Sequence, residues 1–162
     1  MIKTIDHFND KYEFLSNFYP AEVLYGDLYY LSVEHAFQAA KTFDSLERRL
    51  IRTASTPGKA KRLGRSATLR PDWEKVKVQV MHDLLEYKFN PDEHPDLWDK
   101  LLDTGDAFLI EGNAHGDSYW GCTWVAGEWY GENHLGKLLM EVRTAYQNEL
   151  AENAREEKKY ER

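Results

Sequence analysis

The chain is poor in cysteine. Cys122 is the single cysteine among its 162 residues, which excludes an intrachain disulfide and fits a reducing compartment. No apolar run is long enough to cross a bilayer, and the first residues lack the apolar core of a signal peptide. The sequence therefore predicts a cytoplasmic protein with no membrane partner.

Familiar catalytic and binding motifs are also missing. The six histidines are scattered and form no HExxH pattern, and a single cysteine cannot supply a cysteine-based zinc site. The chain has no GxSxG motif for acyl transfer, no P-loop and no glycine fingerprint of a Rossmann nucleotide site. We expect neither a metal nor a cofactor.

The net charge is negative, but the positive charges are concentrated in one segment. The net charge of −7 argues against a protein that coats nucleic acid non-specifically. Residues 47–77 nevertheless carry ten Lys or Arg against three Asp or Glu, so this segment is +7 and the remainder is −14. Two interpretations are open: local recognition of an anion such as phosphate, or an ordinary basic helix surface.

Apolar spacing and turn residues predict a mainly α fold with small β hairpin elements. Helices are expected at 32–43, 45–54, 57–65, 71–89, 95–102 and from 133 onward, with a strand in 2–8, a hairpin over 23–30 and a strand at 107–111. The helix over 45–54 is expected to pack through Leu46, Leu50 and Ile51. One domain covers 1–150, and the charged helix end 151–162 is expected to be frayed.

The helix from Ser32 to Lys41 has two side-chain stripes. Val33, Ala36, Phe37 and Ala40 form the apolar one. Glu34, Gln38 and Lys41 form a polar stripe beside it, because residues at i, i+4 and i+7 share a helix face. This polar stripe is either a solvated edge of the helix or the lining of a polar pocket.

The segment 112–132 alternates rings and glycines. Its rings and glycines are Tyr119, Trp120, Trp124, Trp129, Tyr130 and Gly112, Gly116, Gly121, Gly127, Gly131. Such a loop or loose hairpin suits a planar heterocycle, or it covers part of the core. Asp117 either faces a ligand or stabilises a turn, and Asn133 is expected to be the N-cap of the last helix.

Several motifs occur together in one order and spacing. They are Leu15–Pro20, Val33–Lys41, Thr56–Lys61, Trp73, Val80-Met81, Lys88-Phe89, Leu102–Asp106, Trp120-Gly121 and Gly131–Arg143. Over about residues 8–146 the chain resembles the NADAR (YbiA-like) family. The resemblance implies a mostly helical YbiA-like fold and hydrolysis of an N-glycosidic bond.

Members of this family are linked to two groups of substrates. One is the phosphorylated ribosylaminopyrimidine intermediates of riboflavin synthesis, and the other is ADP-ribose attached to guanine bases in DNA or nucleotides. The resemblance implies a site formed by Asn17, Glu34, Gln38, Lys41, Trp73, Asp117, Trp120, Gly121 and Asn133. In many relatives a short glycine-rich loop follows Trp120-Gly121, whereas here Cys122–Ala126 intervenes, which changes the wall expected beside the base.

Cleavage of a ribose–nitrogen bond passes through positive charge at the anomeric carbon, so it needs a carboxylate, an activated water and a protonated leaving group. We assign Glu34 to the water or the developing charge, and Asp117 to the leaving group. Lys41 either holds phosphate or orients Glu34 through Gln38, or it attacks the open-chain sugar aldehyde as a Schiff-base lysine.

The other predicted site residues bind the base and the phosphates. Trp120 or Trp73 would stack on the base, and the basic 59–65 segment would hold the phosphates through Lys59, Arg62 and Arg65. A hypothesis of another class is a sensor that binds ADP-ribose or NAD without turnover.

Overall fold

The computed structural model describes residues 1–161, and its fold is mainly α. Helices hold 52% of the residues and strands 12%, which confirms the predicted fold class. The chain forms two compact units, one over Phe8–Leu97 and one that joins Met1–His7 to the chain from Trp98 onward.

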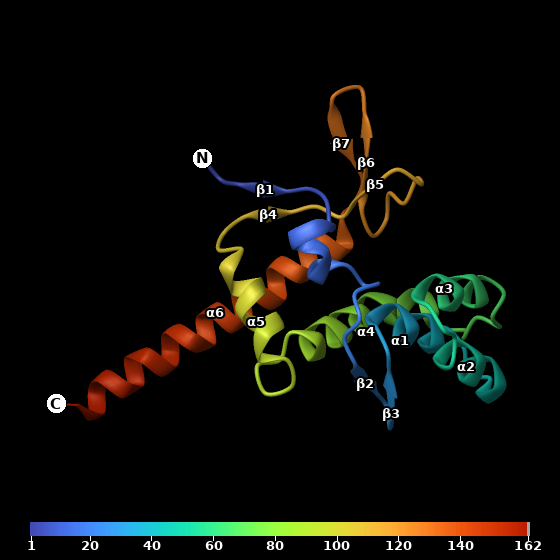
Figure 1. The fold of residues 1–162 in the computed structure, drawn as a ribbon, viewed down its shortest axis with the longest axis horizontal. Coiled ribbons are helices and arrows are strands. Elements are labelled where there is room, and N and C mark those ends of the chain that lie inside the picture. Colours follow the sequence, from blue (N-terminus) through green and yellow to red (C-terminus); the bar gives the residue numbers. More distant parts are fainter. Residues whose placement is uncertain (162) are drawn as a thin grey trace. The chain divides into compact units, whose positions relative to one another are not determined.

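The Phe8–Leu97 unit is built around one buried helix, α1 (Val33–Ala40), all of whose residues are buried. Its other elements are η1 (Asp10–Leu15), β2 (Val23–Tyr25), β3 (Leu28–Tyr30), α2 (Ser45–Arg52), α3 (Pro57–Arg65), α4 (Trp73–Lys88) and the start of α5 (Pro95–Asp103). Helices α2, α3 and α4 all pack against α1 (Figure 1). A helix surrounded on several sides has little room for a solvated polar edge.

Local chemistry explains where α1 begins. The Ser32 hydroxyl accepts a hydrogen bond from the backbone N–H of His35 at 3.2 Å and lies 2.7 Å from the ring Nδ1 of the same residue. The other ring nitrogen, Nε2, lies 2.9 Å from the carbonyl oxygen of Ala54. Asp44 and Thr56 cap α2 and α3 through their side chains in the same way. Each predicted start of these three helices is therefore supported by a capping bond.

The predicted hairpin is present, with Val23 of β2 opposite Tyr30 of β3. Gly26 turns the chain with a φ of +59°, a left-handed conformation that glycine adopts without a Cβ clash. The expected packing of α2 was wrong at two positions. Leu46 and Leu50 are 62% and 51% exposed, whereas Ile51 is 1% exposed. Positions 46 and 50 share a helix face at i and i+4, and this face is largely exposed.

The second unit contains several short strands and the long final helix. Its elements are β1 (Thr4–Ile5), the end of α5, β4 (Phe108–Leu109), β5 (Gly112–Asn113), β6 (Cys122–Val125), β7 (Glu128–Tyr130) and α6 (His134–Tyr160). Strands β1 and β4 pair in parallel, β5 pairs in parallel with β6, and β6 pairs antiparallel with β7. The glycine-rich segment 112–132 is thus a small three-stranded sheet that includes the hairpin expected as one alternative.

Helix α6 buries Leu135, Leu138, Leu139 and Val142 as the sequence predicted, and Tyr146 is half-buried. The helix continues to Tyr160, and its residues from 148 onward are all exposed. The domain boundary at 150 and the frayed end stay predictions, and Arg162 lies outside the described residues. Within residues 1–161, no helix combines the length and apolarity needed to span a bilayer. The same residues contain no cluster of three or more potential metal ligands.

Candidate functional site

The predicted polar stripe on α1 is buried. Glu34 is 7% exposed and Gln38 is 4% exposed, which excludes the solvated-edge interpretation of these two residues. The Glu34 carboxylate accepts a hydrogen bond from the Gln38 side-chain amide at 2.8 Å. The Glu34 backbone N–H donates to the carbonyl oxygen of Asn17 at 3.1 Å, which places the segment after η1 beside the start of α1.

The surroundings of Glu34 shift the pKa of its carboxyl group in opposite directions. Burial raises the pKa of the Glu34 carboxyl group, and the Gln38 hydrogen bond and the ammonium groups of Lys61 and Lys41 lower it by less. Burial lowers the pKa of Lys41, whereas the Glu34 carboxylate raises it. A buried acid and a half-buried amine on one helix, both shifted toward neutrality, are a pattern typical of catalytic sites.

Two amide oxygens beside Glu34 lack hydrogen-bond partners. The Asn17 Oδ1 and Gln38 Oε1 atoms are buried and accept no hydrogen bond among the described residues. The Asn17 amide nitrogen lies 3.5 Å from the sulfur of Met81. Because a buried, unpaired oxygen is unfavourable by about 1–3 kcal/mol, these atoms are suited to accept hydrogen bonds from a bound hydroxyl or N–H group.

Helix α3 approaches this cluster through a glycine. A Cβ built on Gly64 would lie 1.9 Å from the Gln38 Oε1 atom, so only glycine allows this close approach. Lys61 lies one turn earlier on the same helix, and its charge acts on both Glu34 and Lys41. Lys61 lies within the predicted phosphate-binding segment 59–65 but was not among its three named site residues. In the sequence, Gly64 within the otherwise basic helix α3 is the signal for the face of α3 that packs against α1.

The predicted phosphate-binding residues are less deeply placed. Lys59 is exposed, and its ammonium group donates to the Ser55 hydroxyl at 2.8 Å. Arg62 is exposed as well. Arg65 is exposed but acts on the cluster, since its charge contributes to the lowered pKa of Lys41. Of the three predicted cations, Arg65 is the one with an electrostatic link to the Glu34 cluster.

Trp73 belongs to the packing behind α1. It is 5% exposed, and its ring lies 5.1 Å from the Phe37 ring at a tilt of 57°. The Lys41 ammonium group lies 5.8 Å from the centre of the same Phe37 ring. Trp73 therefore supports the helix that carries Glu34 and offers little free ring surface of its own.

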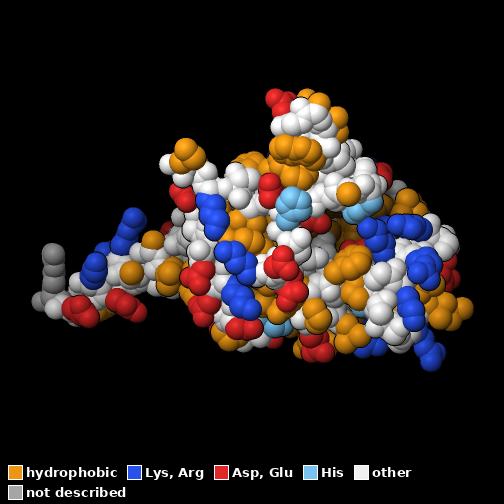
Figure 2. Space-filling model, turned by 45° about the horizontal axis from the view of Figure 1, so that its top comes forward, with side chains coloured by type: hydrophobic (Ala, Val, Ile, Leu, Met, Phe, Trp, Pro, Cys, Tyr) orange, Lys and Arg blue, Asp and Glu red, His pale blue; other side chains and the backbone are white. Residues whose placement is uncertain are grey.

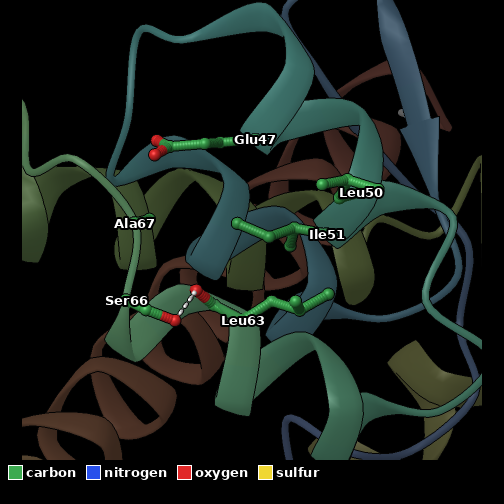
Figure 3. A pocket seen from close by; sticks show the side chains of 6 residues that line it. All are labelled: Glu47, Leu50, Ile51, Leu63, Ser66 and Ala67. Atoms are coloured by element: carbon green, nitrogen blue, oxygen red, sulfur yellow. Dashed lines mark hydrogen bonds between the residues drawn. The ribbon is translucent and has the colours of Figure 1, made fainter.

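Glu47 on α2 links the segments that follow α1 and α3 by hydrogen bonds. Both oxygens of Glu47 accept hydrogen bonds, from the hydroxyl groups of Thr42 and Thr68 at 2.6 and 2.9 Å and from the Thr68 N–H at 2.9 Å. A small cavity of about 160 Å³ lies beside it (Figure 3). Leu50 and Ile51 face Leu63 across this cavity (Figure 3). Because the Glu47 carboxylate accepts hydrogen bonds at both oxygens, it holds α2 against the segment that follows α3.

In the second unit, Asp117 forms a turn. Its Oδ1 atom accepts hydrogen bonds from the backbone N–H groups of Tyr119 at 3.1 Å and Trp120 at 2.9 Å. The Asn113 side chain also bonds to the Asp117 backbone. It accepts from the Asp117 N–H at 3.0 Å and donates to the Asp117 carbonyl oxygen at 2.8 Å. Asp117 therefore fixes the backbone at Trp120, as the turn interpretation predicted.

Four of the five rings of segment 112–132 form two groups. Tyr119 lies 5.0 Å from Trp120 and 4.3 Å from His134, measured between ring centres. Trp124 and Trp129 form the other group, 5.1 Å apart. This second pair lines an open cavity of about 420 Å³ together with Asp6 and His7. The predicted aromatic loop is thus two separate aromatic clusters.

The two remaining predicted residues, Gly121 and Asn133, contact backbone groups of the same unit. A Cβ on Gly121 would lie 2.1 Å from the Glu111 carbonyl oxygen, so glycine permits close contact with that strand end. Asn133 occupies the N-cap position with a φ of +53°, but its side chain does not cap the helix, contrary to expectation. It accepts from the Glu111 N–H at 3.0 Å and donates to the Leu109 carbonyl oxygen at 2.8 Å.

The predicted site residues thus fall into two sets. Asn17, Glu34, Gln38 and Lys41 meet in the Phe8–Leu97 unit, where Lys61 joins them. Asp117, Trp120, Gly121 and Asn133 lie in the other unit, around the start of α6.

Comparisons with known proteins agree with the resemblance noted in the sequence. The NADAR domain matches residues 5–147. An N-glycosidase of Nostoc punctiforme is 42% identical over 145 residues, covering 86% of this chain and 89% of that protein. The Escherichia coli N-glycosidase YbiA is 41% identical over 137 residues, covering 83% of this chain and 82% of YbiA.

The structure comparison gives the same result. The NMR structure of the E. coli protein YbiA aligns with a TM-score of 0.77 at 39% identity, covering 94% of this chain and 90% of that one. A riboflavin biosynthesis protein of Vibrio vulnificus is 34% identical over 148 residues, which cover 90% of this chain and 38% of that protein. The N-glycosidase names support a glycosyl hydrolase enzyme.

Proposed function

Because this chain belongs to the NADAR domain family, we propose that it is an N-glycosidase that hydrolyses a ribose–nitrogen bond, removing ADP-ribose from guanine bases in DNA or in a nucleotide. The observation that carries the proposal is the buried Glu34 carboxylate, which lies among an amide, an amine and a second ammonium group. Such a group is unfavourable for folding and useful for chemistry.

Glu34 is the proposed general base. Its raised pKa brings its basicity closer to neutral pH, where it accepts a proton from water more readily than an ordinary carboxylate does. Its negative charge also stabilises the positive charge that develops at the anomeric carbon. The unpaired oxygens of Asn17 and Gln38 are proposed to accept hydrogen bonds from the sugar hydroxyls.

Lys41 has two proposed roles, each supported by a different observation. Its electrostatic attraction to Glu34 favours an orienting role, in which it keeps the carboxylate ionised and in place. Its lowered pKa favours a nucleophilic role, in which the neutral amine attacks the sugar aldehyde and forms a Schiff base. We prefer the orienting role. Lys61 and Arg65 are the cations proposed to hold the phosphates.

Asp117 and Trp120 are proposed to act on the base. Since one Asp117 oxygen already accepts two backbone N–H groups, we infer that this residue positions the Trp120 ring for stacking on the base. A part for its carboxylate in protonating the leaving group is the alternative.

A second candidate substrate is a phosphorylated ribosylaminopyrimidine of riboflavin synthesis, and the name of the Vibrio relative favours it. The site chemistry is the same, because both substrates carry a phosphorylated ribose bonded to nitrogen. A sensor without turnover is disfavoured, because a buried carboxylate would weaken binding of an anionic nucleotide. The single buried cysteine fits the proposed cytoplasmic location.

The test is incubation with ADP-ribosylated guanosine and, separately, with a ribosylaminouracil phosphate, followed by mass spectrometry. We expect the first substrate to yield guanosine and free ADP-ribose. Release from the second substrate alone would assign the chain to riboflavin intermediates. Binding without release from either would refute the enzyme and support the sensor.

A further inference from the structure

One cation of the Phe8–Leu97 unit lies in its interior and has no part in the reaction proposed above. Lys88, the last residue of α4, has an exposed fraction of 0%, whereas every other Lys and Arg of this unit is exposed or half-buried. Figure 2 shows Lys and Arg side chains gathered on the surface of the part that holds α2 and α3. Because burying an ammonium group is unfavourable, Lys88 needs partners that compensate for the lost water.

A carbonyl group and two rings contact the Lys88 ammonium group. Its Nζ atom donates to the carbonyl oxygen of Ser16 at 2.8 Å, across 72 residues of sequence. The same atom lies 5.7 Å from the centre of the Tyr19 ring and 5.2 Å from that of the Phe89 ring. Hydrogen bonding and cation–π attraction therefore hold the ammonium group at the turn that follows η1.

That turn carries Asn17. The Ser16 carbonyl oxygen also accepts from the Tyr19 N–H at 3.1 Å, and the Ser16 hydroxyl accepts from the Phe18 N–H at 3.1 Å. The Asn17 carbonyl oxygen accepts from the Glu34 N–H at 3.1 Å. The turn therefore connects the end of η1 directly to the residue proposed as the general base.

Helix α4 contacts this turn at two places. Lys88 and Met81 share one face of the helix at i and i+7, and the Met81 sulfur lies 3.5 Å from the Asn17 amide nitrogen. Lys88 holds the Ser16 carbonyl group, which belongs to the peptide bond that leads into Asn17. These contacts fix the direction of the Asn17 Oδ1 atom, which is buried and accepts no hydrogen bond among the described residues.

We propose that Lys88 is a positioning residue, which holds the Ser16 carbonyl group and so directs the Asn17 Oδ1 atom toward a sugar hydroxyl of the substrate. The inference rests on the proposed function for the role of Asn17, and it adds the group that keeps Asn17 in place. An apolar side chain of similar length would fill the same space at no electrostatic cost, but it would remove the bond between α4 and the Ser16 carbonyl group.

Thermal stability distinguishes positioning from support of the fold alone. Replacing a buried charge by an apolar side chain of similar volume is often neutral or stabilising. The Ser16 carbonyl oxygen is uncharged and keeps its bond from the Tyr19 N–H. Lys88→Met is therefore expected to melt within about two degrees of the wild type or above it.

The binding test uses isothermal titration calorimetry with ADP-ribose and with ribose 5-phosphate, because both candidate substrates carry a phosphorylated ribose. We expect Lys88→Met to bind about three- to tenfold more weakly than the wild type, the effect of about one hydrogen bond. Lys75→Met, the same change on the exposed face of α4, is the matched control and should bind like the wild type. Unchanged binding by a folded Lys88→Met variant, or a wild type that binds neither compound, would overturn the proposal.

A double-mutant cycle tests whether Lys88 acts through Asn17. If it does, Asn17→Ala and the double variant Asn17→Ala/Lys88→Met should bind equally weakly, within about twofold. Additive losses would overturn the proposal, because Lys88 would then act on another group. If Lys88→Met does not fold, Lys88→Gln, whose side chain falls one bond short of the Ser16 carbonyl group, takes its place in the cycle and additivity is judged in the same way.

Turnover separates this inference from the proposed function. With ADP-ribosylated guanosine, Lys88→Met should raise KM by the factor seen in binding and leave kcat within about threefold, because Asn17 holds the sugar in the ground state and the transition state alike. Weaker sugar binding by the variant, without hydrolysis by the wild type, would refute the enzyme and keep the role of Lys88. Hydrolysis with the same KM in both proteins would keep the enzyme and refute the role of Lys88.

Discussion

Glu34 and Asp117 are both predicted catalytic carboxylates, but they differ in burial and in hydrogen bonding. Glu34 is buried in α1, accepts one side-chain hydrogen bond and has a raised pKa. Asp117 is half-buried, and one of its oxygens accepts two backbone N–H groups in its own turn. The Asp117 carboxylate stabilises its own turn. The buried Glu34 carboxylate is unfavourable for the fold and stabilises no turn or helix end.

The comparison separates two kinds of functional residue. A side chain that stabilises its own loop contributes through the groups it positions, here the Trp120 backbone. A side chain that remains buried against an electrostatic penalty is available for chemistry. We therefore assign catalysis to Glu34 and positioning to Asp117, and the following variants test that division.

The largest effect is expected from Glu34→Gln. The amide keeps the oxygen that accepts from Gln38 but cannot take a proton, so turnover should fall by roughly 10²–10⁴-fold. Mass-spectrometric assays of product release would measure the loss. Glu149→Gln, at an exposed site on α6, is the control and should keep wild-type activity. Wild-type turnover by Glu34→Gln would remove Glu34 from the mechanism.

Lys41 should give the next largest effect. In the orienting role the charge is what matters, so Lys41→Met should lose about 10²-fold in kcat, while Lys41→Arg should retain most of it. Borohydride added during turnover should trap no adduct on the wild-type protein. A trapped sugar on Lys41, or an inactive Lys41→Arg variant, would instead establish the Schiff-base role. Lys75→Met, on the exposed face of α4, controls for loss of one positive charge.

Asp117 should show a small effect for the conservative change. Asp117→Asn keeps an oxygen for the Tyr119 and Trp120 N–H groups, so kcat should fall by less than about tenfold. Asp117→Ala removes that acceptor and should lose more, chiefly through KM, because the Trp120 ring is no longer held. If Asp117→Asn loses as much kcat as Glu34→Gln, Asp117 is a second catalytic carboxylate and the division between the two residues is wrong.

The smallest expected effect is on stability. Because the pKa of Glu34 is raised in the folded state, ionisation destabilises the fold, and stability falls as pH rises from the unfolded value through the folded one. Glu34→Gln should therefore melt like the wild type at low pH and a few degrees higher at neutral pH. Thermal melts followed by circular dichroism at both pH values would check this. A lower melting temperature for the variant at neutral pH would show that the ionised carboxylate stabilises the fold.

Much of the fold could be predicted from the sequence because its signals are local. Capping residues such as Ser32 and Thr56, and the glycine turn at Gly26, set the element boundaries. The packing of α2 was predicted less well, since an eight-residue helix with Leu46, Leu50 and Ile51 does not reveal which leucines meet a neighbour.

The geometry of the candidate site residues was predicted for α1 and for the Asp117 turn, and less well elsewhere. The i, i+4 spacing of Glu34 and Gln38 already implied their contact, which the structure places at 2.8 Å. The inward position of Lys61 depends on how α3 crosses α1 at Gly64, a tertiary contact that periodicity does not encode. For the same reason the bonds from Asn133 to Leu109 of β4 and to Glu111 were not predicted, since they join residues far apart in the chain.

The most direct test of the central claim is the pH dependence of kcat/KM for the wild type and for the residual activity of Glu34→Gln. If Glu34 acts as an ionised base in its buried setting, the wild-type rate should rise with pH through an apparent pKa above the ordinary glutamate value of 4.5. This acidic limb should be absent from the variant. A wild-type limb at or below the ordinary value, or the same limb in both proteins, would contradict the account.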